Sequence, residues 1–260
     1  MKRTILTVLL AAVAFVAASA DSFQPKANDK AVVIQGNARF TVLTDRLIRM
    51  EWSEDGVFED RASFGIVNRN LPVPDFKVRK SAGSLTINKG KVVLTYKGNG
   101  SFDEKNLSAT FTMNGRKQTW RPGMSDEGNL LGTARTLDKF AGDETMDPYD
   151  KGVCSRDGWA IIDESSRHLF KEVDADWKYW VDKRPEGNRQ DLYLFAYGHD
   201  YTAAVGDFAK VAGNIPLPPK YSFGYWWCRY WAYSDTELVD LAQHFRNFNI
   251  PIDVMIIDTS

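Results

Sequence analysis

Apolar and polar residues alternate along residues 31–113, which predicts a series of consecutive β-strands. The clearest segments are residues 39–52 and residues 85–96, each made of two alternating runs with a turn between them. A further run, residues 107–113, ends at Asn114-Gly115, a dipeptide that favours a tight hairpin turn. Strands of this length with regular turns are typical of an antiparallel β-sandwich.

Periodicity is weak over residues 120–158, which are rich in Gly, Asp and Pro. A long irregular stretch inside a compact domain is usually functional or disordered. Strand patterns resume at residues 159–162 and 192–197, and residues 201–211 suit a short helix. The prolines within residues 216–219 then predict a domain boundary, because proline disrupts the interior of both helices and sheets.

The pattern changes after these prolines. Residues 222–228 and residues 252–257 are compact apolar runs, which are typical of buried strands. Between them, Ser234 and Glu237 have the spacing of a helix capping box. The apolar residues that follow recur on one helical face: Leu238, Leu241, Ala242, Phe245 and Phe248. A strand, a helix and a second strand in this order predict a βαβ unit with parallel strands.

A parallel pair of strands needs further helices and strands to cover its faces. A (β/α)8 barrel takes about 200–250 residues, far more than residues 217–260 provide. We therefore expect the chain to be the amino-terminal part of a longer protein. The expected domains are a β-sandwich over residues 21–216 and the start of a barrel, truncated, over residues 217–260.

Residues 1–20 have the features of a secretory signal peptide. Lys2 and Arg3 are followed by an apolar run that is too short to span a bilayer, and Ala18-Ser19-Ala20 is a small-residue cleavage site. We expect cleavage between Ala20 and Asp21 and a periplasmic or secreted mature protein. A membrane anchor is the alternative, but polar Asp21 follows the apolar run at once, and no later segment is apolar enough to span.

The composition excludes some classes of function. The chain has 33 basic and 34 acidic residues and a net charge of −1, so nothing in it indicates nucleic-acid binding. Its 8 tryptophans suit stacking on sugars, although most tryptophans simply belong to a core. Cys154 and Cys228 fit no metal motif; an exported chain permits a disulfide between them, but we favour two free or buried thiols.

Two groups of motifs extend over nearly the whole mature chain. Three lie near its end: Phe223–Tyr230 (FGYWWCRY), Tyr233–Leu238 (YSDTEL) and Ile250–Asp258 (IPIDVMIID). Four lie upstream: Phe58–Arg61 (FEDR), Val67–Arg69 (VNR), Asn129–Asp138 (NLLGTARTLD) and Ser155–Trp159 (SRDGW). Each is weak alone, but together they resemble glycoside hydrolase family 31, which contains α-glucosidases, α-xylosidases and related transglycosylases.

The resemblance implies a fold and an activity. It implies an amino-terminal β-sandwich similar to the galactose-mutarotase fold, and then a (β/α)8 barrel that begins near Tyr221. It implies hydrolysis of α-linked oligosaccharides with retention, by an Asp nucleophile and an Asp acid/base that lie beyond residue 260. No catalytic residue, metal or cofactor is then expected in this chain. The competing hypotheses are a noncatalytic secreted carbohydrate-binding β-sandwich and a secreted structural protein.

Three residues are candidates for substrate binding: Asp258, Tyr230 and Trp226. Asp258 ends the second parallel strand, on the face where barrel active sites form. The resemblance places Asp258 and Tyr230 in the −1 subsite, where a carboxylate accepts hydrogen bonds from sugar hydroxyls. The alternatives are a helix cap for Asp258 and packing for Tyr230. Trp226 and Trp227 alternate, so at least one belongs to the core.

Other polar residues are open to more than one interpretation. Asp253 lies at the opposite end of the same strand and is expected to be structural, and Arg229 is expected to form an ion pair. The loop from Asn129 to Asp157 resembles one that reaches the barrel mouth, but it also suits a solvated acidic loop. Its candidates are Asp138, Asp143, Asp147, Arg156 and Asp157. The three histidines, His168, His199 and His244, are scattered and are expected to be structural or exposed. Thr259 and Ser260 depart from the family pattern beside the −1 sugar, which leaves the preferred sugar open.

Overall fold

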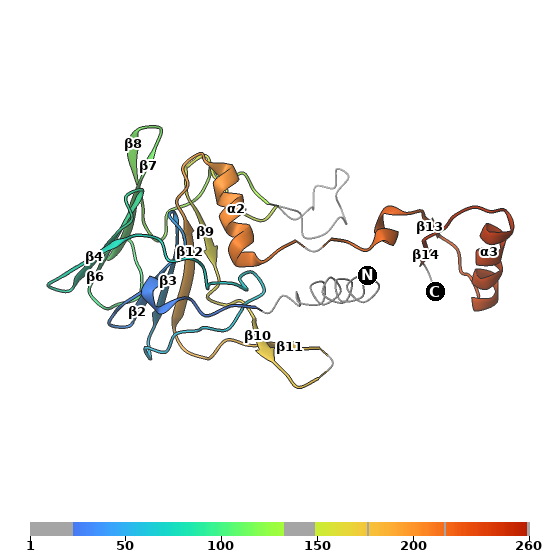
Figure 1. Ribbon diagram of the computed structural model, residues 1–260, viewed down its shortest axis with the longest axis horizontal. Helices are drawn as coiled ribbons and strands as arrows, with labels where there is room; N and C mark the ends of the chain where they lie inside the picture. Colours follow the sequence, from blue (N-terminus) through green and yellow to red (C-terminus); the bar gives the residue numbers. More distant parts are fainter. Residues whose placement is uncertain (1–22, 133–148, 176, 216, 259–260) are drawn as a thin grey trace, which may run out of the picture. The chain divides into compact units, whose positions relative to one another are not determined.

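The computed structural model describes residues 23–132, 149–175, 177–215 and 217–258. The chain divides into two compact units, residues 1–214 and residues 215–260. The first unit is mainly β, and its two large sheets are antiparallel throughout, as predicted (Figure 1). The expected signal peptide, residues 1–20, lies outside the described residues. Within the described ranges, none of the helices has the length and apolar character needed to cross a membrane.

The first large sheet has the strand order β1-β2-β3-β12-β9. Its strands are β1 (Val32–Gln35), β2 (Ala38–Val42), β3 (Leu47–Ser53), β12 (Arg189–Phe195) and β9 (Ala160–Asp163). The pairing of β2 with β3 confirms the hairpin predicted over residues 39–52. The strand β12 lies between β3 and β9, so the sheet is completed only by residues that are distant in the sequence.

The second large sheet is a meander in sequence order, β4-β5-β6-β7-β8. Its strands are β4 (Lys77–Ser81), β5 (Ser84–Asn88), β6 (Val92–Lys97), β7 (Leu107–Met113) and β8 (Arg116–Trp120). The predicted hairpins over residues 85–96 and at residues 107–115 are both present. Gly90 and Gly115 have φ of 80° and 74°, which a residue without a Cβ adopts at little cost in these turns.

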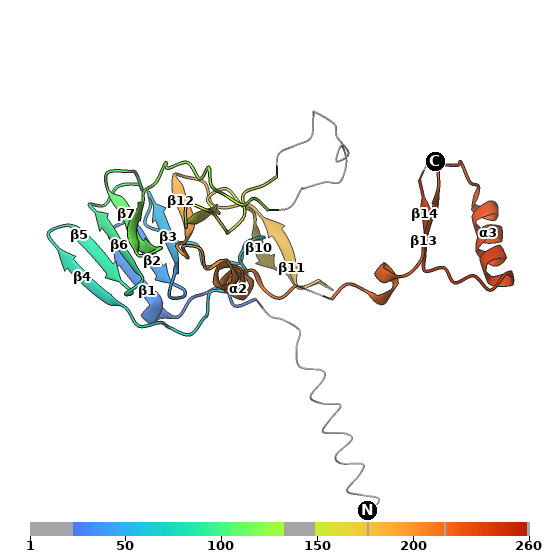
Figure 2. The same ribbon diagram turned by 90° about the horizontal axis from the view of Figure 1, so that it is seen from above.

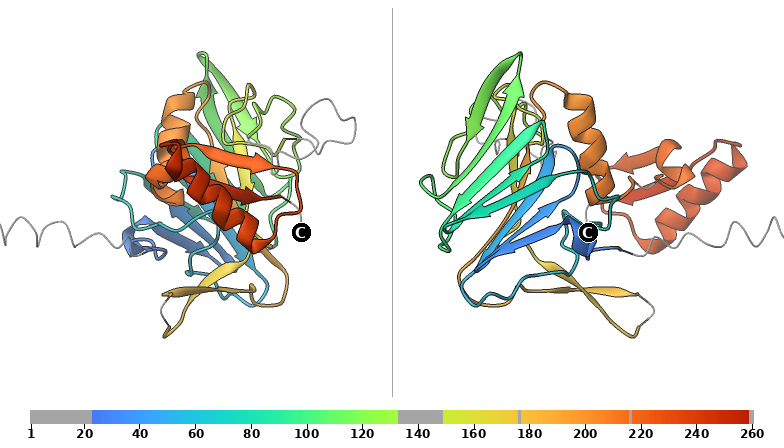
Figure 3. Two further views of the ribbon diagram at one scale, coloured as in Figure 1. Left: turned by 90° about the vertical axis from the view of Figure 1, so that its right-hand side faces the viewer. Right: turned by 60° about the vertical axis from the view of Figure 1, so that its left-hand side comes forward.

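The two large sheets face each other (Figure 3), and an apolar core contains residues of both. Along β5, β6 and β7 buried and partly exposed residues alternate, so one face of this sheet is buried. That face meets residues of β2, β3 and β12, and the rings of Phe40 and Tyr96 lie 5.4 Å apart. The alternation that predicted the strands therefore also identified the inner face of this sheet.

The first sheet differs because β2 and β3 are buried on both faces. A second apolar cluster covers the outer face and includes Leu47, Tyr193 and Phe195 of the sheet. Helix α2 (Tyr201–Ala212) adds Ala204 and Val211 to that cluster and lies beside β12 and β9 (Figure 1). The helix matches the prediction for residues 201–211. Polar residues on the outer face of β2 and β3 are consequently enclosed, and they form the ionic network described below.

Two smaller features of the first unit were not predicted. A hairpin of β10 (Leu169–Glu172) and β11 (Tyr179–Asp182) projects from the sheets (Figure 2). A 3-10 turn, η1 (Asp29–Ala31), precedes β1. The hairpin strands are short and end in charged residues, which weakens the alternating pattern that identifies a strand.

The second unit contains η2 (Lys220–Phe223), β13 (Trp226–Arg229), α3 (Asp235–Asn247) and β14 (Val254–Ile257). β13 and β14 are parallel, as the βαβ pattern predicts. Ser234 and Glu237 form the predicted capping box at the start of α3.

One prediction for the second unit was wrong. Residues 222–228 were expected to form a single buried strand, but this run begins with the 3-10 helix η2, and β13 starts at Trp226. The strand is largely exposed in the described residues. The physical reason is that a parallel pair is buried only when both of its faces are covered, whereas α3 contacts the face that carries Trp227.

Candidate functional site at the carboxyl edge of β13 and β14

Tyr230 and Asp258 each follow directly after a strand of the parallel pair. The register pairs Arg229 with Ile257, the last residues of β13 and β14. Because parallel strands end at the same edge of a sheet, Tyr230 and Asp258 emerge side by side along that edge. Tyr230 is 80% exposed, and Asp258 is exposed as well.

The two faces of the strand pair carry different residues. The ring of Trp227 lies 6.2 Å from that of Phe245 in α3, at an interplanar angle of 71°, so this face meets the helix. Trp226 lies on the opposite face, as the predicted alternation requires. Its indole Nε1 donates a hydrogen bond to the carbonyl oxygen of Tyr221 at 3.2 Å, which fixes one edge of the ring and leaves 46% of the residue exposed.

Asp258 lies beside Cys228, which shares the face of Trp226. Desolvation raises the pKa of the Cys228 thiol, and the charge of Asp258 and a hydrogen bond to it raise that pKa further. The thiol is therefore protonated at neutral pH and serves as a weak donor to the carboxylate. Within the described ranges Cys154 and Cys228 are both free.

The opposite end of β14 is structural, as expected for Asp253. Its carboxylate accepts a hydrogen bond from the backbone N of Tyr225 at 2.9 Å. A Cβ placed on Gly224 would lie 2.1 Å from Asp253 Oδ2, so only glycine fits there. Arg229 was expected to form an ion pair, but its described contact is with an aromatic ring: its guanidinium carbon lies 4.8 Å from the centre of the Trp231 ring.

Hydrogen bonds in the first unit fix the two ends of the loop between Asn129 and Asp157. The amide oxygen of Asn129 accepts hydrogen bonds from the backbone N of Leu131 and of Gly152, both at 2.8 Å. Asp157 accepts one from the backbone N of Gly128 at 3.0 Å. The described role of Asp157 is thus to hold the loop in place. Three other candidates lie outside the described residues: Asp138, Asp143 and Asp147.

The remaining candidates of that loop and the histidines make ordinary contacts. The carbonyl oxygen of Arg156 lies 2.9 Å from Nε2 of His199. His168 packs against Phe64, with ring centres 6.4 Å apart. In the part of the chain that the structure describes, no three His, Cys, Asp or Glu side chains are grouped so as to hold a metal ion.

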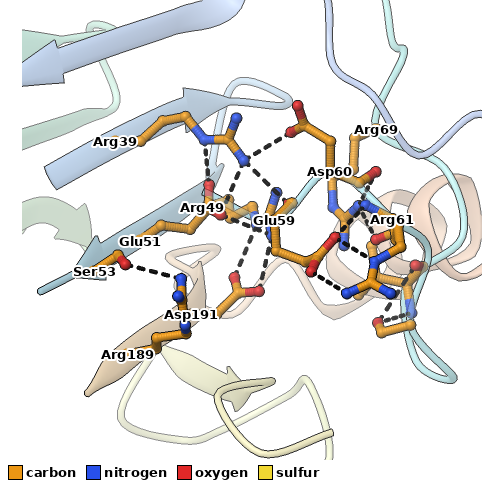
Figure 4. Close-up of polar contacts among 12 residues, drawn as sticks. Arg39, Arg49, Glu51, Ser53, Glu59, Asp60, Arg61, Arg69, Arg189 and Asp191 are labelled. Atoms are coloured by element: carbon orange, nitrogen blue, oxygen red, sulfur yellow. Dashed lines mark hydrogen bonds and ion pairs between the residues drawn. The ribbon is translucent and has the colours of Figure 1, made fainter. Parts of the chain in front are cut away.

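Two of the upstream motifs, FEDR and VNR, belong to a buried ionic network that the sequence did not reveal (Figure 4). On the outer face of the first sheet, Arg39 donates to Glu51 from Nε at 2.6 Å and from Nη2 at 2.9 Å. Arg49 makes two bonds of 2.8 Å to the carboxylate of Asp191, and Arg184 contacts the same carboxylate at 2.9 Å. Alternating charges inside otherwise apolar strands were the only available sign of this network.

The network also holds the segment Glu59–Arg61. Arg39 and Arg49 both donate to the carbonyl oxygen of Glu59, at 3.1 and 2.8 Å. Arg61 donates two hydrogen bonds to the Glu59 carboxylate, from Nε at 2.9 Å and from Nη2 at 2.8 Å. Buried Arg69 donates to the carbonyl oxygen of Arg61 at 2.9 Å. The FEDR and VNR motifs are therefore tied to each other and to the sheet.

The pKa values of the buried carboxyl groups shift in different directions. Burial alone would raise the pKa of Asp191, but the charge of Arg49 and its hydrogen bonds outweigh burial and hold that pKa well below its usual range. Burial prevails at Glu51 and raises its pKa in spite of Arg49. Glu164 shows the same direction, because burial exceeds the hydrogen bond from Ser63.

Comparison with known proteins shows similarity to one family of glycosidases. Residues 215–260 match the model of the "Glycosyl hydrolases family 31 TIM-barrel domain". The chain is 26% identical over 196 residues to the α-xylosidase of Saccharolobus solfataricus, an alignment that covers 70% of this chain and 26% of that protein. It is 36% identical over 73 residues to α-glucosidase 2 of Bacillus thermoamyloliquefaciens, which covers 28% of this chain and 9% of that protein.

Solved structures of the family share the fold. The GH31 dextranase of Flavobacterium johnsoniae, complexed with glucose, aligns with a TM-score of 0.51 and 16% identity, over 90% of this chain and 34% of that one. The xylosidase from Aspergillus niger aligns with a TM-score of 0.52 and 14% identity, over 87% of this chain and 38% of that one. The chain thus spans only part of the proteins it matches. Residues 215–260 match the TIM-barrel domain of glycosyl hydrolase family 31, and the chain as a whole resembles the amino-terminal portion of proteins of that family.

Proposed function

We propose that the protein to which this chain belongs is a retaining α-glycosidase that hydrolyses α-linked oligosaccharides. The observation that carries the proposal is the parallel βαβ unit within residues 215–260, which match the family's barrel domain. The last strand of this unit, β14, ends at Ile257, directly before Asp258. We assign the first unit to a β-sandwich of the galactose-mutarotase kind, and the second to the first βαβ unit of a (β/α)8 barrel.

In this proposal Asp258 accepts hydrogen bonds from two neighbouring hydroxyls of the sugar at subsite −1, and Tyr230 and Trp226 line the same subsite. A carboxylate makes strong, charge-assisted hydrogen bonds of this kind. The exposed positions of all three residues support the assignment, because a substrate can reach them. Asp258 also lies at the carboxyl end of its strand, where barrel enzymes build their active sites.

The reaction itself requires two further carboxyl groups, which we place on later barrel strands beyond residue 260. A retaining glycosidase holds its nucleophile and its acid/base about 5–5.5 Å apart. The nucleophile forms a covalent glycosyl intermediate, and the second group first protonates the leaving oxygen and then activates water. The 260-residue chain is therefore expected not to hydrolyse glycosides by itself. We further propose that residues 1–20 direct export to the periplasm or the medium.

The test uses the full-length product of the gene with aryl α-glucoside and aryl α-xyloside substrates. Asp258→Ala should lower kcat/KM by about 10–200-fold, because a hydrogen bond to a charged group is worth about 1.5–3 kcal/mol. Asp240→Asn is the matched control: this exposed carboxylate lies on α3, away from the carboxyl edge, and should leave kcat/KM within about twofold.

Two outcomes would contradict the proposal. An unchanged kcat/KM in the Asp258→Ala enzyme would leave Asp258 only a structural role. Turnover of either substrate by the purified 260-residue chain would show that the catalytic carboxylates lie within it. A full-length product that binds oligosaccharides without cleaving them would favour the noncatalytic carbohydrate-binding alternative.

A further inference from the structure

The first unit contains a pocket of about 370 Å³ between the β10–β11 hairpin and the segment Glu59–Ala62. Its volume falls in the range of about 300–1,000 Å³ that is usual for small-molecule sites. The side chains that matter here are Phe23, Phe170, Tyr179, Asp60, Arg61 and Glu172.

One wall of the pocket is aromatic. The rings of Phe23 and Tyr179 stack at 4.3 Å with an interplanar angle of 18°, and Phe170 lies 5.0 Å from Phe23. The three rings support one another, yet each residue remains partly exposed. The wall therefore offers preformed apolar surface that a ligand covers without rearranging the rings.

The other side chains that line the pocket are polar and electrically balanced: Glu59, Asp60 and Arg61 come from one segment, and Glu172 pairs with Tyr179 across the hairpin. Asp60 pairs with Arg39 at 2.8 Å, Glu59 is gripped by Arg61, and Glu172 lies 3.7 Å from Lys178. Each carboxylate thus has a cation of its own, which disfavours a cationic ligand, and the three carboxylates themselves disfavour an anionic one. The side chains of Asp60 and Glu172 are still 44% and 72% exposed, so their remaining lone pairs can accept hydrogen bonds.

The polar side is also rigid. Arg39 and Arg49 both donate to the carbonyl oxygen of Glu59 (Figure 4). The guanidinium of Arg61 is held by the Glu59 carboxylate and, at 2.8 Å, by that of Asp182. A site built on groups that are already fixed loses little entropy when a ligand binds. The buried network accordingly positions Asp60, one of the two acceptors of this pocket, through its ion pair with Arg39.

We infer that this pocket binds one or two pyranose units of a neutral oligosaccharide. A pyranose has an apolar C–H face, which would pack on the aromatic wall, and a rim of hydroxyls, which would donate to Asp60 and Glu172. A flat aromatic ligand would leave these acceptors unpaired, and a cationic one would meet carboxylates that are already neutralised. The inference concerns the first unit and does not depend on the proposed hydrolysis at the barrel.

The test is isothermal titration of the purified 260-residue chain with maltotriose and, separately, isomaltotriose. For whichever of the two sugars binds, Tyr179→Ala should weaken the affinity by at least tenfold, because it removes one of the three rings of the apolar wall. Glu172→Gln should weaken it about tenfold by exchanging a charged acceptor for a neutral one. The exposed position of Glu172 makes this variant safe for folding, which melting curves will verify.

Two controls decide where the sugar binds. Trp180, 58% exposed, follows Tyr179 in β11 and so points to the other face of the hairpin; Trp180→Ala should leave the affinity within about twofold. Asp258→Ala separates this pocket from the proposed barrel site, to which Asp258 belongs. Loss of binding in Asp258→Ala but not in Glu172→Gln would overturn the pocket and would support the proposed barrel site. Loss in Trp180→Ala, or binding of neither sugar, would also overturn the inference.

Discussion

The burial of Arg49 in the first unit could not be predicted from the alternating strand pattern. Residues 39, 49 and 51 alternate with apolar neighbours, as on a strand with one wet face, yet Arg49 is almost fully buried. Its main partner, Asp191, is 142 positions away in the sequence. The sequence predicts the strand because alternation is local, but a partner at that distance leaves no local pattern. Asp258, by contrast, could be placed at its strand end because it belongs to a contiguous βαβ unit.

Glu164 gives a prediction about pH at this scale. It is buried, its Oε2 has no hydrogen-bond partner, and burial raises its pKa. A carboxyl group whose pKa is higher in the folded state favours folding when protonated. Its contribution is present below the ordinary pKa of about 4.3 and is lost as the pH rises through the folded-state pKa.

In Glu164→Gln the buried side chain is an amide that stays neutral at every pH. The variant therefore does not lose stability from this position as the pH rises, whereas the native chain does. The free energy of unfolding of the variant, relative to the native chain, should therefore increase from pH 4 to pH 7 in urea titrations. Glu104→Gln, at an exposed position, is the matched control and should show no such trend. A difference for Glu164→Gln that is constant with pH would contradict the role of its ionisation.

Elements of the fold were predictable where the pattern was local. The hairpins, α2 and the parallel unit were all predicted, because alternation, capping residues and turn glycines mark them directly. The β10–β11 hairpin and the position of β12 between β3 and β9 were not, because they depend on contacts between distant segments. The sequence also does not show which turns are crowded by residues from other segments, as Met113 and Gly198 crowd Gly158.

Gly158 should be far less tolerant of alanine than Gly83. Both have positive φ, 79° and 76°, so both substitutions carry the same backbone cost of about 1–2 kcal/mol. A Cβ at Gly158 would lie 2.5 Å from Met113 Sδ and 3.1 Å from the Cα of Gly198, whereas nothing lies within 4 Å at Gly83.

The extra crowding predicts a further loss of about 1–3 kcal/mol in the free energy of unfolding for Gly158→Ala. Urea denaturation of the two single variants measures the difference directly. Equal losses would mean that Met113 moves aside without cost, and the close packing of the SRDGW motif would then have no energetic weight.

At the scale of the whole molecule, the two units differ in how much apolar surface they cover. The first has two apolar clusters of its own, whereas the second leaves large apolar side chains exposed in the described residues. They include Phe223, Trp226, Tyr230, Trp231, Phe248 and Ile257. Exposed apolar surface of this kind promotes association unless another part of a protein covers it.

Removing residues 215–260 should therefore raise solubility without unfolding the first unit. Sedimentation velocity over a range of concentrations should show less self-association for residues 21–214 than for residues 21–260. The melting temperature of the shorter chain should lie within a few degrees of the main transition of the longer one. Unfolding or aggregation of the shorter chain would show that the boundary is misplaced.

The place of β12 in the first sheet has a consequence for the timing of folding. β3 and β12 lie next to each other, and Arg49 finds Asp191 only across that junction. At about 5–20 residues per second, a ribosome needs roughly 7–28 s to add the 142 residues that separate these partners. Throughout that interval the β2–β3 hairpin has an open edge, and Arg49 lacks the carboxylate of Asp191. The first unit therefore closes late, which leaves the nascent chain time to engage a chaperone before it becomes compact.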